Sequence, residues 1–118
     1  MDNIILGSNI ECLNNGLNTP LLLAAACGHD ETVNLLLERG ADSAIRNMKD
    51  RDALWMAVLY GHRSKGLSRV IDSLCRKDIA VNHQDSSGCT PLHECASRNL
   101  SRPVQLLVDN GAGAVLLF

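Results

Sequence analysis

Aromatic residues are almost missing from this chain of 118 residues, which has one Trp, one Tyr and one Phe. A surface on which nucleic-acid bases stack needs several aromatic side chains, so the composition excludes a site of that kind. Positive charge is not in excess either, because 11 Lys and Arg face 13 Asp and Glu, for a formal net charge of −2. The chain therefore has no general electrostatic attraction to nucleic acid or to anionic lipid.

Long apolar runs are also missing. Apolar runs such as Leu21–Cys27 and Val115–Phe118 fall far short of the roughly 20 residues that a helix needs to cross a bilayer. The first residues include Asp2 and no basic residue, unlike the start of a secretory signal. Five cysteines occur without a C-x-x-C pair, and reduced thiols explain such an odd and scattered set. We therefore expect a single, metal-free domain in a reducing compartment, the cytoplasm or the nucleus.

One phrase occurs three times along the chain. It reads "TPLLLAAACGH" from Thr19, "DALWMAVLYGH" from Asp52 and "TPLHECASRNL" from Thr90. The first step is 33 residues and the second is 38, so the middle copy carries about five extra residues, near positions 63–68. The second halves agree as well: "VNLLLERGAD", "VIDSLCRKDI" and "VQLLVDNGAG". Self-similarity at such a period indicates a stacked repeat protein.

Each copy is typical of a helix–turn–helix. Thr19, Asp52 and Thr90 are good N-caps, and Pro20 and Pro91 stand at the first helical position, where the missing N–H costs nothing. Small residues recur in each first helix, where neighbouring helices must approach closely. The polar, turn-rich segments between copies, "GADSAIRNMKDR" and "DIAVNHQDSSG", favour projecting hairpin-like loops.

The ends of the helices are marked too. Gly28 and Gly61 follow the first helices where a left-handed C-cap is expected, and Asn99 replaces glycine in the third copy. We expect the second helices near residues 31–39, 69–76 and 103–110.

These motifs resemble those of the ankyrin repeat family, whose signature contains T-P-L-H-x-A, then G-H, then V-x-L-L-L-x-x-G-A-D. The resemblance covers essentially the full length, although the middle copy lacks Thr-Pro and the Gly-Ala-Asp ending. It implies an all-α solenoid of stacked helix–turn–helix pairs with projecting hairpin loops. The chain would form one ankyrin-repeat domain, with the tail of a partial repeat at 1–13, repeats at 14–46 and 47–84, and an incomplete repeat at 85–118.

The resemblance also implies the function: a non-catalytic module that binds a partner protein on its concave face, without cofactor or small-molecule substrate. The alternative is a structural piece of a longer array that has no dedicated partner site. Carried onto this sequence, the binding positions are Asn18, Met48, Lys49, Arg51, Leu59, Tyr60, Ser87, Ser97 and Arg98. Leu59 and Tyr60 match no shared chemistry in the other copies, so we expect both to be exposed.

Three further features could serve metal binding, partner binding or phosphate binding, and each also has a purely structural interpretation. Cys89, His93 and Cys95 lie close in sequence, but zinc needs four converging ligands, and the resemblance makes His93 a partner of the hairpin backbone. Trp55 replaces that histidine in the middle copy and either packs under the hairpin or serves as an exposed anchor. A basic cluster forms either a solvated face or a phosphate-binding patch, although nucleic acid is disfavoured; it comprises Arg63, Lys65, Arg69, Arg76 and Lys77.

Overall fold

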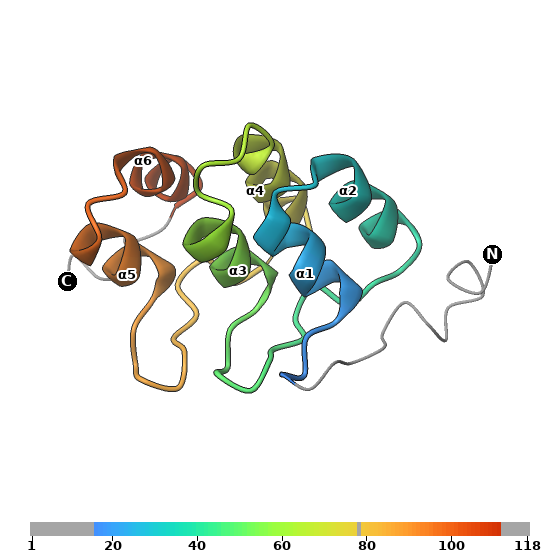
Figure 1. Ribbon diagram of the computed structural model, residues 1–118, viewed down its shortest axis with the longest axis horizontal. Coiled ribbons are helices and arrows are strands. Elements are labelled where there is room, and N and C mark those ends of the chain that lie inside the picture. The colour runs from blue at the N-terminus through green and yellow to red at the C-terminus, as the bar shows by residue number, and fades with distance from the viewer. Residues whose placement is uncertain (1–15, 78, 112–118) are drawn as a thin grey trace.

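Two rows of helices make up the body of the protein. The computed structural model describes residues 16–77 and 79–111, so the partial repeat at 1–13 and the apolar end at 114–118 lie outside the described residues. The described residues form helices and no strand: α1 (Pro20–Cys27), α2 (Asp30–Glu38), α3 (Ala53–Tyr60), α4 (Leu67–Cys75), α5 (Pro91–Ser97) and α6 (Ser101–Asp109). Helices α1, α3 and α5 stand in one row and α2, α4 and α6 in the other, as Figure 1 shows. The predicted all-α solenoid is confirmed.

Three loops precede the first helices and project from the helical body (Figure 1). We call residues 16–18 the first loop, residues 41–51 the second loop and residues 79–89 the third loop. None of the helices in the described ranges is long and apolar enough to cross a membrane.

Local sequence sets the start of each first helix as predicted. The side chains of Thr19, Asp52 and Thr90 each accept a hydrogen bond from the backbone N–H three residues on, over 3.3, 3.1 and 3.2 Å. Pro20 and Pro91 occupy the first helical position. Each cap satisfies a donor that the helix itself leaves unpaired.

The helix ends follow the prediction in the first and third copies and not in the middle copy. Gly28 and Asn99 have left-handed φ values of 72° and 58°. Gly61 has a φ of −98°, so the left-handed cap predicted there is wrong. Position 61 requires glycine because the backbone approaches too closely for a side chain. A Cβ atom there would lie 2.9 Å from the carbonyl oxygen of Ala57 and 3.0 Å from that of Ala25.

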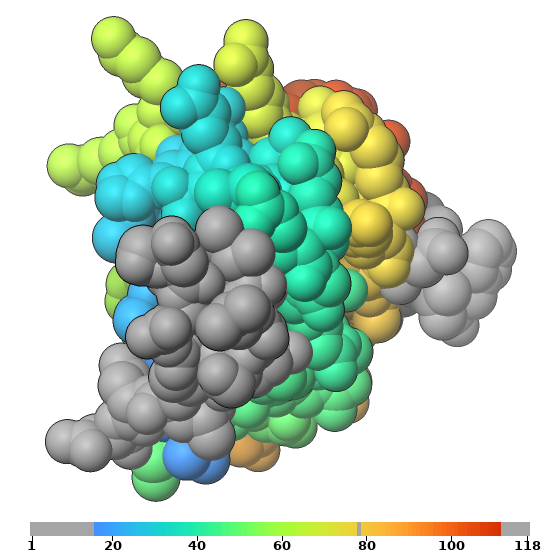
Figure 2. Space-filling view, turned by 90° about the vertical axis from the view of Figure 1, so that its right-hand side faces the viewer, coloured from blue at the N-terminus to red at the C-terminus, as the bar shows by residue number. Residues whose placement is uncertain are grey.

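The second helices begin one or two residues earlier than predicted and end one residue earlier, a shift typical of helix boundaries. The extra residues of the middle copy lie at 61–66, between α3 and α4, slightly before the predicted 63–68. We call residues 61–66 the insert. In Figure 2, yellow-green side chains of this region project from the body near α2.

The core lies between the two rows and between successive repeats. Helix α3 packs against α1 on one side and α5 on the other. The small residues Ala25, Ala57 and Cys95 are fully buried, as expected for close contacts between stacked helices. Trp55 is also fully buried, and its Nε1–H donates to the backbone oxygen of His83 over 2.9 Å. The packed interpretation of Trp55 is therefore correct and the exposed anchor is wrong.

Candidate functional site

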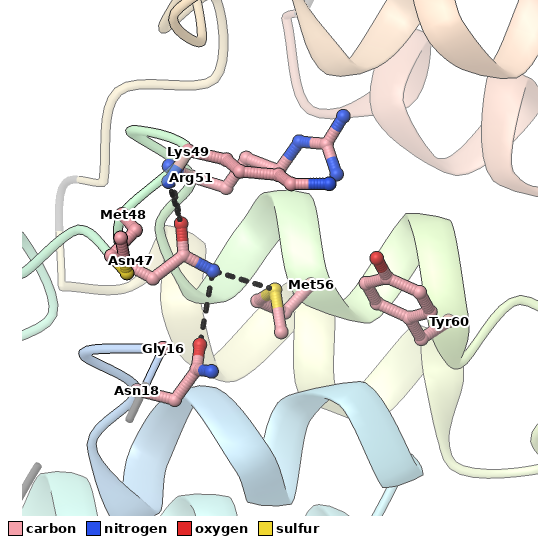
Figure 3. Close-up of a pocket in the computed structure, with 8 residues that line it drawn as sticks. All are labelled: Gly16, Asn18, Asn47, Met48, Lys49, Arg51, Met56 and Tyr60. Atoms are coloured by element: carbon pink, nitrogen blue, oxygen red, sulfur yellow. Dashed lines mark hydrogen bonds between the residues drawn. The ribbon is translucent and has the colours of Figure 1, made fainter. Parts of the chain in front are cut away.

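A hollow of about 550 Å³ opens between the loops and the outer side of α3 (Figure 3). We call it the central hollow. Its lining comes from the first loop, the second loop and α3: Gly16, Asn18, Asn47, Met48, Lys49, Arg51, Met56 and Tyr60.

Asn47 holds the wall of the central hollow together. Its side-chain Nδ2 donates to Asn18 Oδ1 over 2.9 Å and to Met56 Sδ over 3.5 Å. Its Oδ1 accepts from the backbone N–H of Lys49 and of Arg51, over 3.0 and 3.2 Å. One amide therefore fixes the second loop, the end of the first loop and α3 relative to one another, as Figure 3 shows.

Backbone hydrogen bonds connect the tips of all three loops. The N–H of Met48 donates to the oxygen of Gly16 over 3.1 Å. The N–H of Ser86 donates to the oxygen of Lys49, also over 3.1 Å. The rim of the central hollow is thus built from neighbouring repeats whose loops are already joined.

The apolar part of the site is partly exposed. Met48 is 67% exposed at the tip of the second loop, and Tyr60 is 57% exposed at the end of α3. Met56 lies four residues before Tyr60, hence on the same face of α3, and is only 6% exposed. The central hollow therefore has a buried thioether beneath two exposed apolar side chains, one of which carries a hydroxyl.

Leu59 is not part of this surface. It is 3% exposed, so the exposed Leu-Tyr pair predicted from the sequence is wrong for its first member. Helix α3 packs between α1 and α5, so its residues have helices on two sides, unlike those of a terminal helix. Tyr60 alone faces solvent beside Met48.

Arg51 is largely committed to the fold. Its side chain is 15% exposed, its Nε lies 3.2 Å from Asp85 Oδ2, and its guanidinium stands 5.0 Å from the ring centre of Trp55. Burial alone would raise the pKa of Asp85, but hydrogen bonds from Ser87, from the Cys89 N–H and from Arg51 together hold that pKa below its ordinary value. Arg51 thus joins the second and third loops as well as lining the central hollow.

The structure gathers some predicted binding residues and separates the others. Those that line the central hollow are Asn18, Met48, Lys49, Arg51 and Tyr60. The other exposed positions make local bonds: the Ser87 hydroxyl donates to Asp85, the Ser97 hydroxyl donates to the backbone oxygen of Glu94, and Arg98 pairs with the Glu94 carboxylate over 2.6 Å.

Sequence reasoning missed Asn47 and Met56. A signal for Asn47 exists, because Asn14, Asn47 and Asp85 each stand five residues before an N-cap. In the structure, Asn47 and Asp85 use their side-chain oxygens alike, each accepting from the backbone N–H groups two and four residues on. Such side chains stabilise turns in the loop itself. No comparable repeat pattern marks Met56.

The residues weighed for metal or catalysis have structural roles. His93 Nδ1 accepts from the backbone N–H of Thr90 over 3.2 Å, so the imidazole caps the start of its own helix; no bond between His93 and a loop backbone is seen among the described residues. Burial, and then the charge of Glu94, raises the pKa of the Cys95 thiol to about 11, which disfavours the nucleophilic thiolate. Within residues 16–77 and 79–111, no three His, Cys, Asp or Glu side chains form a group that could hold a metal ion.

The basic cluster of the middle copy has acidic neighbours that the sequence order hides. Arg69 pairs with Asp30 of α2 over 3.5 Å. A polar groove of about 270 Å³ between α2 and α4 is lined by Arg69 and Arg76 but also by Asp30, Glu31 and Asp72. Charge of both signs favours the solvated face over a phosphate-binding patch.

Comparison with sequence families gives two matches. Residues 2–68 match the profile described as "Ankyrin repeats (3 copies)", and residues 87–116 match that described as "Ankyrin repeat". A solved ankyrin repeat domain from Acinetobacter baumannii superposes with a TM-score of 0.79 and 27% sequence identity, over 92% of this chain and 56% of that chain.

Among curated proteins, the E3 ubiquitin-protein ligase XBAT33 of Arabidopsis thaliana is 40% identical over 94 residues, which are 79% of this chain and 17% of that protein. The transient receptor potential cation channel subfamily A member 1 of Drosophila melanogaster is 28% identical over 109 residues, 90% of this chain and 9% of that protein. The chain therefore spans less than a fifth of the length of these relatives.

Proposed function

The chain belongs to the ankyrin repeat family, and from that premise we propose that it is a non-catalytic module that binds a partner protein at the central hollow. Ankyrin repeats are generally protein–protein interaction modules. The proposed surface comprises the loop tips and the outer side of α3, on the side where the predicted binding residues gather.

One observation carries the proposal: Met48 and Tyr60 are exposed on either side of the central hollow, above the buried Met56. Most other large apolar side chains of the described residues are buried or half-buried. Met and Tyr are enriched in protein interfaces, and hot spots gather in well-packed pockets. A partner side chain that enters the central hollow would cover this apolar surface.

The test uses affinity purification from a native lysate with quantitative mass spectrometry. The site variant carries Met48→Ala and Tyr60→Ala. The matched control carries Leu35→Ala and Val108→Ala, two similarly exposed apolar residues on α2 and α6. We expect the wild-type chain and the control to retain a common set of proteins that the site variant loses. A set retained equally by all three would refute the proposed surface.

A structural role in a longer array is the alternative, and the large remainder of each relative favours it. The relatives are a ubiquitin ligase and a cation channel, and those activities belong to the whole proteins. If this role is the right one, the site variant and the control would capture the same proteins, while fusion to the neighbouring repeats of a longer chain would raise the stability of the array.

We further propose a reducing compartment, the cytoplasm or the nucleus. The described cysteines support it, since Cys27, Cys75, Cys89 and Cys95 are all free thiols. Imaging of a fluorescent fusion in the source cells tests this, and secretion of the fusion would contradict it.

A further inference from the structure

We propose that the central hollow binds a short segment of the partner protein in which an apolar side chain lies next to a carboxylate. This inference rests on the proposed function and names the chemistry of its partner. It follows from the distribution of apolar surface and charge around the central hollow.

The apolar surface of the central hollow favours an apolar side chain of the partner. Met56 forms a buried floor, and Met48 and Tyr60 stand exposed above it. The volume of about 550 Å³ is within the range of pockets that take a small ligand or a few side-chain atoms. Methionine side chains are flexible and polarisable, so they adapt to apolar groups of different shape.

The uncompensated positive charge of Lys49, on the rim of the central hollow, favours a carboxylate on the partner. None of the described residues that line the central hollow is acidic. The carboxylates of the second and third loops are already engaged: Asp85 with Arg51 over 3.2 Å, Asp50 with Arg46 over 3.7 Å, and Asp42 with the backbone N–H of Ala44 over 2.9 Å. Lys49 is exposed, and no ion pair involves it among the described residues. Its ammonium group is thus available to a partner.

Lys49 is placed so that its charge can contact a partner bound in the central hollow. The backbone of Lys49 is fixed by bonds to Asn47 and Ser86, over 3.0 and 3.1 Å. In Figure 3 the Lys49 and Arg51 side chains both extend from the second loop over α3, on the side toward Tyr60. Since Arg51 is paired with Asp85, a carboxylate beside a bound apolar side chain would meet the Lys49 ammonium. The same ammonium would repel a basic segment.

The experiment selects random ten-residue peptides displayed on phage against the whole chain. We expect enriched peptides to carry Asp or Glu within two positions of Leu, Ile, Met or Phe. Selection against Lys49→Glu should lose the acidic preference and gain Lys or Arg in its place. The control is Lys65→Glu, which makes the same change of charge in the insert and should keep the wild-type preference.

One enriched peptide, labelled with fluorescein, then gives affinities by fluorescence anisotropy. We expect Met48→Ala to weaken its binding about tenfold or more, as for an interface hot spot. Added salt should weaken binding to the wild type more than binding to Lys49→Ala, because screening acts on the charge that the variant lacks. The Leu35→Ala variant should bind as the wild type does.

The outcomes separate this inference from the proposed function. Peptides that require Met48 and Tyr60 but show no acidic preference would overturn the inference and leave the proposed surface standing. Peptides that bind equally to the Met48→Ala, Tyr60→Ala double variant would overturn both. A selection that enriches no peptide would also overturn the inference, since a short segment would then be insufficient.

Discussion

Ser64 donates its hydroxyl hydrogen to the backbone oxygen of Gly28 over 3.2 Å, so the insert of the middle repeat is fastened to the repeat before it. The same hydroxyl accepts from the N–H of Gly66 over 3.1 Å. The backbone oxygen of Ser64 accepts from Arg102 of the following repeat over 2.8 Å. The insert therefore connects three repeats, and its sequence around Ser64 is constrained by packing.

Replacement of Gly28 by alanine should destabilise the protein strongly. Gly28 has a φ of 72°, where an L-residue costs about 1–2 kcal/mol. An added Cβ would also collide with the Ser64 side chain, and such overpacking costs a further 1–3 kcal/mol or so. Urea unfolding followed by circular dichroism gives the free energy of unfolding.

Gly40→Ala is the matched control. Gly40 also has a positive φ, of 94°, but no atom lies within 4 Å of the position that a Cβ would take. The Gly40→Ala variant should therefore lose only the free energy that the strained backbone costs. Equal losses for the two variants would show that the contact between the insert and Gly28 does not constrain the fold.

Truncation of two adjacent residues of α3 should change the stability of the protein by very different amounts. Leu59→Ala removes a buried side chain and should lower the free energy of unfolding by about 2–5 kcal/mol. Tyr60→Ala removes an exposed side chain and should change it by about 0.5 kcal/mol or less. Thermal melts of the two variants suffice, and a Tyr60 loss as large as that of Leu59 would contradict the exposure described for the site.

The local features of the fold could be predicted because neighbouring residues determine them. A cap such as Thr19 or Asp52 bonds to an N–H three residues away, and the repeat shows the same chemistry at each copy. Exposure at Leu59 could not be predicted in this way. It depends on the elements packed around α3, which has α1 on one side and α5 on the other, and no local pattern in the sequence records that packing.

Sequence reasoning grouped some of the residues that line the central hollow, but it predicted neither the others nor the bonds between them. Met48, Lys49 and Tyr60 were expected to lie on one surface, and the structure places all three around the central hollow. Arg51 pairs with Asp85, which lies 34 positions further along the chain. Arg51 was expected to be free to bind a partner, and this pairing gives it a structural role instead. Only the three-dimensional arrangement of the second and third loops shows that pairing.

The cysteines should differ in their rate of alkylation. Cys27 is exposed, whereas Cys95 is buried and its pKa is raised to about 11 by burial and by Glu94. At pH 8 the thiolate fraction of Cys95 is then on the order of one part in a thousand. Treatment of the folded chain with iodoacetamide should modify Cys27 well before Cys95, and peptide mass spectrometry reads the order.

The same samples check the redox state and the absence of metal. Denaturation in urea should make Cys95 reactive, since it removes the burial that raises the pKa. An intact mass that shows a disulfide, or stoichiometric zinc by elemental analysis, would contradict the reduced and metal-free protein expected from the sequence. Early labelling of Cys95 in the folded chain would contradict its burial.

The ion pair between Arg51 and Asp85 should make part of the stability depend on pH. Hydrogen bonds and the guanidinium hold the pKa of Asp85 below its ordinary value, despite burial. Its stabilisation is therefore complete above the unfolded value of about 3.9 and is lost as the pH falls through the lower folded value. Asp85→Asn should cost about 1.5–3 kcal/mol at pH 7, the range for hydrogen bonds to a charged group.

That cost should shrink below about pH 4, because the Asp85 carboxylate then takes up a proton in the unfolded chain before it does so in the folded protein, where its pKa is lower. Asp52, whose pKa burial raises, titrates in both proteins, so its contribution cancels in the comparison. Urea unfolding at pH 7 and pH 3 measures the difference, and Asp109→Asn, an exposed change on α6, should alter stability by about 0.5 kcal/mol or less at both. A double-mutant cycle with Arg51→Ala should give a coupling energy at pH 7 that weakens at pH 3. A cost for Asp85→Asn that is the same at both pH values would mean that the carboxylate charge does not hold the second and third loops together.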